Sequence, residues 1–436
     1  MDSEAREKEQ SKILRRRAIV ACFAGNLFEL YDFVVFGFFA IQIGKAVFPS
    51  HDPITSLLAS FATYGTGFLT RPIGAIVLGS YGDRRGRKTA LSLTITLMAI
   101  ATGLTGFVPT YARAGIWSPI LLVLFRLLQG FSTGGEWGGA TTFMVEYAPA
   151  GRRGFFGSLQ QTSTAAAQLL AIGSALALNT WMPKAALDSW GWRLPFLLGF
   201  VMAPLGYYLR SRVAETPAFT RNEAASNLVA SPLKVVLTEY RRELVTCFGI
   251  TTMWTVGSYV FITFMAAYAA QTLHLSASVA LKAVTVAVLA NLCLIPVSGT
   301  LSDKIGPAPI FLAACVGYLI LSVPFFLYIA SVRTFASVAL VSLVAGALYG
   351  LMNGAAPSML SALFPTNVRY TALSVGYNSG VMIFGGFAPF ISTWLVKTTG
   401  SPAGPGFYPT LCAAISLSAL LAGRKTLFKR PVPQPK

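Results

Sequence analysis

Two carboxylates near the start of the chain lie where a membrane-crossing helix would not be expected to carry charge. Residues 25–38 read GNLFELYDFVVFGF, inside an apolar run from 18 to 48. A charged side chain at the centre of a membrane helix costs roughly 2.5–3.5 kcal/mol. At helical spacing Asn26, Glu29 and Asp32 share one face. Two acids this close favour sharing a proton, so proton binding by Asp32 or Glu29 is predicted. The alternative is that one of them only pairs with an arginine on a neighbouring helix.

Two arginines and a third acid also lie inside apolar runs. Arg126 lies near the middle of its run, and its planar guanidinium can bind a substrate carboxylate in a bidentate manner or pair permanently with Asp32 or Glu29. The two roles are compatible if substrate and acid compete for Arg126. Arg71 is predicted to form a structural ion pair, with Glu136 as its candidate partner. Glu136, among the glycines of GGEWGGA, is either that partner or a second proton-linked acid.

Uncharged polar residues on the same apolar runs are further candidates for substrate contact. Most polar groups in membrane helices are simply hydrogen-bonded to a neighbouring helix, and this is the competing interpretation for each of them. The candidates are Asn26, Tyr31, Gln129, Gln160, Gln168, Trp254, Tyr259, Asn353 and Asn378. Gln161, Asn291 and Tyr377 are further candidates of the same kind.

Composition indicates the kind of protein that holds these residues. The chain has 436 residues, of which 54% are hydrophobic and 11% are charged, whereas a soluble protein carries about 25% charged residues. An all-α polytopic membrane protein is therefore predicted. Runs of about 20 apolar residues give twelve transmembrane helices, at 18–45, 55–79, 89–108, 116–145, 155–179, 192–209, 244–270, 280–301, 309–330, 335–363, 371–396 and 406–423.

Basic residues predict the orientation. With both termini and the alternate loops on the cytoplasmic side, 25 of the 34 Lys and Arg lie inside and 7 outside. The net charge of +18 is thus a topology signal, and no nucleic-acid partner is predicted. The predicted divisions are a cytoplasmic tail (1–17), a six-helix bundle (18–209), a cytoplasmic loop (210–243), a second bundle (244–423) and a cytoplasmic tail (424–436).

The two halves of the chain repeat one another with an offset of 220 residues. Asp83 and Asp303 follow the second and eighth spans, and Gly130 and Gly134 on the fourth span match Gly350 and Gly354 on the tenth. A repeat of six spans is typical of a transporter with two pseudo-symmetric bundles and a substrate site between them.

Several motifs occur together in a specific order. They are ELYDF in the first span, FLTRPIG in the second, GSYGDRRGRK after it, RLLQGFSTGGEWGGA in the fourth, WGWRLPF before the sixth and FPTNVRYTAL before the eleventh. In this combination the whole chain resembles the major facilitator superfamily (MFS) and, within it, the metabolite:proton symporter family. The resemblance implies the two-bundle MFS fold, a proton as coupling ion, no other cofactor and a bacterial inner-membrane location.

The same resemblance implies a substrate class and a gate. The family carries small carboxylates and zwitterions, and FGFFAIQIGKAVFP, LMNGA and FAPFISTWLVKTTG are most similar to citrate/tricarballylate carriers. A second loop motif, DKIGPAP, lacks the basic residues of the first, which suggests a weaker cytoplasmic contact in the second half. Charged residues expected to hold the cytoplasmic side closed are Asp83, Arg84, Arg87, Lys88, Glu146, Arg152 and Asp303. The competing interpretation is that these basic residues only set the topology.

The sequence therefore predicts proton-coupled symport of a di- or tricarboxylate such as citrate, tricarballylate or α-ketoglutarate by a monomer in a lipid bilayer. A carrier of proline or glycine betaine is the alternative, and a membrane receptor that does not transport is a remote one. Both histidines lie in predicted outer loops, and neither an HExxH motif, a P-loop nor a paired-cysteine metal site is present. No enzymatic activity and no metal are expected.

Overall fold

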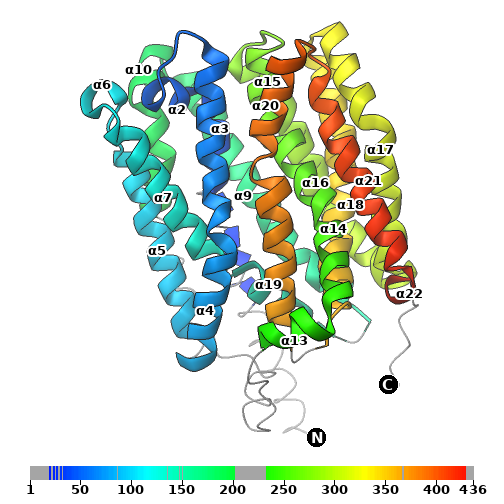
Figure 1. Ribbon diagram of the computed structural model, residues 1–436. Helices are drawn as coiled ribbons and strands as arrows, with labels where there is room; N and C mark the ends of the chain where they lie inside the picture. Colours follow the sequence, from blue (N-terminus) through cyan, green and yellow to red (C-terminus); the bar gives the residue numbers. More distant parts are fainter. Residues whose placement is uncertain are drawn as a thin grey trace, which may run out of the picture.

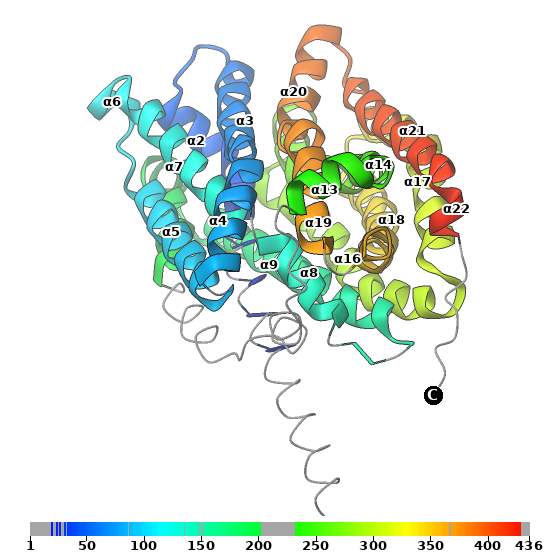
Figure 2. The ribbon, with the colours of Figure 1, turned by 60° about the horizontal axis from the view of Figure 1, so that its bottom comes forward.

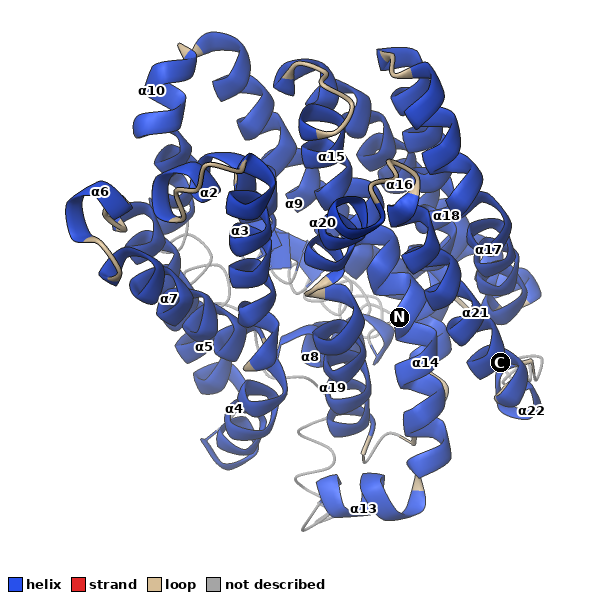
Figure 3. Ribbon diagram, turned by 45° about the horizontal axis from the view of Figure 1, so that its top comes forward, coloured by secondary structure: helices blue, strands red, loops and turns tan. Residues whose placement is uncertain are grey.

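The computed structural model consists of helices joined by short loops throughout the residues it describes (Figure 3). These are residues 19–20, 23–24, 26–27, 30–31, 33–85, 87–134, 136–146, 148–149, 151–201, 232–365 and 368–428. Some side chains within these ranges also lie outside the description, including those of Asp83, Arg84, Arg87, Lys88, Glu136 and Glu146. Glu29 and Asp32 lie outside it entirely.

The first half contains helical residues 33–38 followed by a series of defined helices. These are α2 (Ala40–Val47), α3 (Pro53–Leu69), α4 (Arg71–Arg85), α5 (Arg87–Phe107), α6 (Tyr111–Ala114), α7 (Trp117–Thr133), α8 (Glu136–Glu146), α9 (Arg153–Trp181), α10 (Lys184–Ser189) and the 3₁₀ turn η1 (Gly191–Arg193). The predicted second span is divided at Thr70 into α3 and α4. Pro72 lies in the first turn of α4, where its missing N–H is tolerated.

The second half contains α13 (Pro232–Glu239), α14 (Arg241–Ser258), η2 (Tyr259–Phe264), α15 (Met265–Gln271), α16 (Ala277–Ile305), α17 (Pro307–Val332), α18 (Phe335–Ser361), α19 (Arg369–Gly380), η3 (Val381–Gly385), α20 (Ala388–Thr399), η4 (Gly404–Gly406), α21 (Phe407–Ala422) and α22 (Arg424–Leu427). Six helices in the described part are long and apolar enough to cross a membrane, and all six match predicted spans of this half.

Two helix groups lie side by side, the first-half helices running from blue through cyan to blue-green and the second-half helices from green to red (Figure 1). The end near α4, α13 and α22 is called the inner end here, and the end near α2, α6 and α10 the outer end. The described parts of the loops predicted to be cytoplasmic lie at the inner end (Figure 1). Helix α13 falls within the predicted loop 210–243 and packs on α14 and α19.

The repeated glycines have equivalent structural roles in the two halves. A Cβ atom on Gly130 or Gly134 of α7 and its extension would collide with the backbone of Gly67 or Arg71. In the second half, a Cβ atom on Gly350 would lie 3.0 Å from the backbone oxygen of Asn291, and Gly354 makes a similarly close approach to α16. The 220-residue repeat therefore places small residues where the fourth helix of each bundle crosses the second.

The two groups contact each other through α9, which packs on α16 and α18, and through α3, α4 and α8, which pack on α19 and α20. Figure 2, viewed toward the inner end, shows α8 and α9 reaching from the first group beneath the second. Two π-helical segments, η2 and η3, interrupt the helices of the second group beside this contact. Such segments occur frequently at functional sites.

Candidate functional site

Arg126 is completely buried in the first helix group. Its Nη1 donates a hydrogen bond of 2.6 Å to Oε1 of Gln129, one turn further along α7. Nε2 of Gln129 in turn donates to the hydroxyl of Thr102 on α5, at 2.8 Å. Because both ends of the Gln129 amide are engaged, this residue orients the guanidinium of Arg126. Its predicted contact with substrate stays a prediction.

Aromatic rings surround the guanidinium of Arg126. Its Cζ atom lies 4.4 Å from the ring centroids of both Phe33 and Phe36 and 5.2 Å from that of Tyr64. Phe33 and Phe36 are one turn apart in the first span, and Tyr64 faces them from α3. Ring faces stabilise a cation where water is excluded, so this shell holds a permanent positive charge inside the protein.

Arg71 lies against the same shell. It is 3% exposed, and its Cζ atom is 4.6 Å from the centroid of Phe33 and 4.5 Å from that of Phe68. Because Arg126 is 4.4 Å from the Phe33 centroid, the two Cζ atoms can be no more than about 9 Å apart. At that separation and an effective dielectric constant of 20, two positive charges repel by about 2 kcal/mol before any neighbouring anion is counted. Phe68 also contacts Tyr259 of the second helix group, with centroids 5.3 Å apart.

The predicted proton-binding acids Glu29, Asp32 and Glu136 cannot be placed against these arginines, because their side chains lie outside the described part of the chain. No ion pair of Arg71 with an acid is found among the described side chains. The predicted pair between Arg71 and Glu136 therefore stays a prediction, as do the roles of the other two acids.

Asn26 and Tyr31, two predicted substrate contacts, connect the first span to α9. Nδ2 of Asn26 donates to the Ser163 hydroxyl at 2.6 Å, and Nε2 of Gln160 donates to Oδ1 of Asn26 at 3.4 Å. The hydroxyls of Tyr31 and Ser174 are 3.1 Å apart. These contacts hold the first span against α9 and fit the competing interpretation of ordinary interhelical hydrogen bonds.

Four other predicted candidates, Trp254, Asn353, Asn291 and Gln168, form one chain of buried hydrogen bonds across the two helix groups. Nε1 of Trp254 donates to Oδ1 of Asn353 at 2.5 Å, and Nδ2 of Asn353 donates to Oδ1 of Asn291 at 2.9 Å. Nδ2 of Asn291 donates to Oε1 of Gln168 at 3.5 Å. Nε2 of Gln168 then donates to the hydroxyl of Ser258 at 2.9 Å. Gln168 on α9 is thereby tied to α14 and α16, so the chain joins the two halves.

Nearer the inner end, aromatic and amide side chains connect the halves again. The rings of Trp137 on α8 and Tyr377 on α19 are stacked with centroids 3.8 Å apart, and Trp254 lies 5.6 Å and 5.5 Å from them. Nδ2 of Asn378 donates to the carbonyl of Gly134 at 2.9 Å. Two predicted candidates, Tyr377 and Asn378, therefore lie on the contact between the helix groups.

Asp303 forms a contact between the halves at the inner end. Its two carboxylate oxygens accept hydrogen bonds from the backbone N–H groups of Gly154 and Phe155, at 2.6 and 3.0 Å. These groups belong to the first turn of α9, where the helix dipole favours an anion. Arg152, which precedes this turn, is exposed. The side chains of the other predicted gating residues are not among those that the structure describes; these residues are Asp83, Arg84, Arg87, Lys88 and Glu146.

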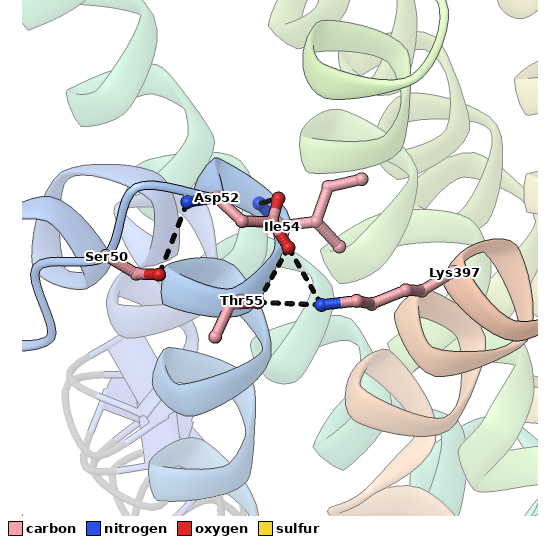
Figure 4. A network of polar contacts seen from close by, with 5 residues as sticks. All are labelled: Ser50, Asp52, Ile54, Thr55 and Lys397. Atoms are coloured by element: carbon pink, nitrogen blue, oxygen red, sulfur yellow. Dashed lines mark hydrogen bonds and ion pairs between the residues drawn. The ribbon is translucent and has the colours of Figure 1, made fainter.

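An ion pair joins the halves at the outer end, and we call Asp52, Thr55 and Lys397 the outer latch (Figure 4). Nζ of Lys397 on α20 lies 2.8 Å from Oδ2 of Asp52 and donates to the Thr55 hydroxyl at 2.7 Å. The carboxylate also accepts a bond from the backbone N–H of Ile54 and caps α3. These contacts, first of all that with Lys397, hold the pKa of Asp52 well below its usual range.

The sign of this shift defines when the outer latch is charged. When folding lowers the pKa of a carboxyl group, its stabilising interaction is fully present above the pKa of that group in the unfolded chain, about 3.9 for Asp. The interaction is lost as the pH falls through the lower pKa of the group in the folded protein. The outer latch is therefore intact throughout the neutral range. Both partners are about half exposed, and exposed ion pairs contribute little net stability, so the latch can open at little cost.

Sequence reasoning did not identify the outer latch or the aromatic shell. Asp52 and Lys397 are 345 residues apart, and each looks like an ordinary loop charge. The shell left a weak signal, because Phe33 and Phe36 share one helix face, as do Tyr64 and Phe68. Among the described residues, no group of three or more His, Cys, Asp or Glu could hold a metal ion.

The sequence of this chain is similar to those of several known transporters. Residues 17–231 and 220–423 match the family described as "Sugar (and other) transporter". The glycine betaine/proline/ectoine/pipecolic acid transporter OusA of Dickeya dadantii is 36% identical over 95% of this chain and 84% of its own. The citrate-proton symporter of Klebsiella pneumoniae is 35% identical over 92% of this chain and 90% of its own. The proline/betaine transporter of Escherichia coli K12 is 35% identical over 92% of this chain and 82% of its own.

Solved structures support the same fold. The MFS proton:xylose symporter XylE, bound to 6-bromo-6-deoxy-D-glucose, superimposes with a TM-score of 0.75 and covers 96% of each chain at 17% identity. An inward-open structure of XylE from E. coli gives a TM-score of 0.66. These likenesses confirm the predicted fold class, an all-α membrane protein with the two-bundle arrangement of the MFS.

Proposed function

Because this chain belongs to the sugar (and other) transporter family of the major facilitator superfamily, we propose that it is a proton-coupled symporter of a small organic acid. The proposed substrate is a di- or tricarboxylate such as citrate, tricarballylate or α-ketoglutarate. The proposed location is a bacterial inner membrane, with both termini cytoplasmic. The observation that carries the proposal is the buried guanidinium of Arg126, held by Gln129 inside the aromatic shell.

Arg126 is suited to anchor a carboxylate. A guanidinium is permanently charged and offers parallel N–H donors to both carboxylate oxygens. Gln129 and Thr102 hold it in one orientation, so little side-chain entropy is lost on binding. In this scheme the substrate competes with Asp32 or Glu29 for Arg126. Displacement of the acid favours its protonation, which couples the proton to the substrate.

Alternating access then depends on contacts that form and break at the two ends. The outer latch would open to admit substrate and proton, while Asp303 keeps α16 bound to the first turn of α9. After the outer end closes, breaking the Asp303 contacts would open the inner end and release the substrate and the proton there. This is the rocking of two bundles around a central site.

A carrier of proline or glycine betaine is the second candidate, and two observations favour it. Relatives of both substrate classes are similarly identical to this chain. In addition, Trp137, Trp254 and Tyr377 form a cluster of rings of the kind that binds quaternary ammonium groups. The stacked rings of Trp137 and Tyr377 would have to separate to receive such a cation.

Uptake by purified protein in proteoliposomes tests the proposal. With an inward proton gradient, radiolabelled citrate should accumulate, and unlabelled citrate or tricarballylate should inhibit it more strongly than glycine betaine or proline. Accumulation should collapse when a protonophore is added. Accumulation of betaine but of no carboxylate would reject the organic-acid proposal in favour of the second candidate.

A further inference from the structure

Arg71 has no assigned partner and is the most unusual charge in the described part of the molecule. Its side chain is 97% buried, being 3% exposed, and within that part its Nε and Nη2 atoms have no hydrogen-bond partner. Its contacts are the rings of Phe33 and Phe68. Buried donors without a partner are rare in native proteins and call for a specific explanation. A stabilising role in packing alone would not require a guanidinium.

The position of Arg71 suggests that explanation. Phe33 contacts the guanidinium groups of both Arg71 and Arg126, and their Cζ atoms are therefore no more than about 9 Å apart. Phe68, the second ring on Arg71, touches Tyr259 of the other helix group. Arg71 also occupies the position equivalent to Asn291 in the 220-residue repeat, and Asn291 belongs to the hydrogen-bond chain between the halves. Arg71 is thus a central residue beside the contact between the bundles.

We propose that Arg71 is a second carboxylate-binding residue, so that Arg71 and Arg126 together bind a substrate with at least two carboxylates on a short carbon chain. The inference rests on the proposed function, in which Arg126 binds the first carboxylate. A guanidinium carbon lies about 4 Å from the carbon of a carboxylate that it binds through two N–H···O bonds. The two carboxyl carbons of a four- or five-carbon diacid are about 4–5 Å apart. Two guanidiniums within about 9 Å can therefore bind the two ends of one bent diacid.

Charge supports a dianion at this site. The described groups that contact Arg71 are neutral rings, so its charge has no counter-ion among the described side chains. A substrate with one carboxylate, bound at Arg126, would leave the charge of Arg71 without a counter-ion, whereas the second carboxylate of a diacid would neutralise it and occupy the donors of Arg71 that have no described partner. The site should accordingly distinguish a diacid from a molecule of the same size with one carboxylate.

Succinate and its monoamide, succinamate, provide this comparison because they differ in one carboxylate only. Inhibition of citrate uptake should be at least tenfold stronger with succinate than with succinamate in the wild-type protein. In Arg71→Gln, the apparent affinity for succinate should fall at least tenfold, while that for succinamate changes less than threefold. Arg71→Lys, which keeps the charge, should retain part of the preference for succinate over succinamate. It replaces Arg71→Gln in this test if the glutamine variant does not fold.

Arg193→Gln is the matched control. Arg193 is also a partly buried arginine of the first helix group, stacked on Trp192 at 4.2 Å, but it binds the backbone carbonyls of Val108 and Ser189 near the outer end. This variant should keep the wild-type ratio of the apparent affinities for succinate and succinamate. The inference would be overturned if Arg71→Gln lowered the apparent affinities for succinate and succinamate equally. It would also be overturned if both Arg71 variants kept the wild-type ratio of these affinities.

Glu136→Gln tests the rival explanation, an ion pair between Arg71 and Glu136. If that variant lowers the unfolding temperature as much as Arg71→Gln and neither alters the succinate-to-succinamate ratio, Arg71 is a structural residue and the inference fails. The proposed function fails separately: it is rejected if the wild-type protein accumulates no carboxylate under a proton gradient. Uptake of mono- and dicarboxylates without any effect of Arg71 would reject only the second subsite.

Discussion

Replacement of Arg126 by lysine tests the proposed anchor most directly. Lysine keeps one positive charge in the aromatic shell, so the net charge of the site does not change. It removes the planar fork that can bind both oxygens of a carboxylate and that donates from Nη1 to Gln129. The substitution therefore isolates the geometry of the guanidinium from its charge.

The size of the effect follows from the lost hydrogen bond. An ammonium group can make one strong bond to the carboxylate where the guanidinium makes two. A hydrogen bond to a charged group contributes about 1.5–3 kcal/mol, and each 1.4 kcal/mol corresponds to a tenfold change in affinity. We expect the KM for citrate to rise roughly 10- to 150-fold.

The assay is initial-rate uptake of radiolabelled citrate by proteoliposomes under a fixed proton gradient. The unfolding temperature of the purified protein in detergent serves as the folding control. Arg193→Lys is the matched variant, since Arg193 also stacks on a ring and donates hydrogen bonds but lies away from the shell. A KM for Arg126→Lys within twofold of the wild type, with normal uptake rates, would refute the anchor role.

Other expected outcomes concern the proton, the outer latch and helix packing. Asp32→Asn should abolish accumulation driven by a pH difference and leave substrate exchange partly active; surviving accumulation would assign the proton to another acid. Lys397→Met should lengthen distances between spin labels on α3 and α20, because it removes the ion pair with Asp52. In the wild type those distances should not change from pH 5 to 8, since the pKa of Asp52 is lowered below its ordinary value of about 3.9; a transition in that range would contradict this. Gly130→Ala should lower the unfolding temperature, since overpacking costs about 1–3 kcal/mol, whereas Gly173→Ala, with open space around it, should not; equal effects would contradict the packing argument.

Sequence alone determined the features that depend on local composition. Apolar runs predicted the six described spans of the second half, because each crossing helix must bury its own backbone polar groups and expose apolar side chains to lipid. The 220-residue repeat matched the glycines of the fourth and tenth spans, and the structure gives them equivalent packing roles. Arg126 stood out as well, since a cation inside an apolar run is expected either to bind a ligand or to pair with a buried acid.

Tertiary structure alone decided which of the polar residues meet. Asn353 and Gln168 were equivalent candidates in the sequence, and only the fold joins them through Asn291 across the bundles. Arg71 and Arg126 are 55 positions apart, and only helix packing brings both to Phe33. The partners Asp52 and Lys397 come from different bundles. Hydrophobicity is a property of each segment, whereas a binding site depends on distances between segments, which the sequence does not contain.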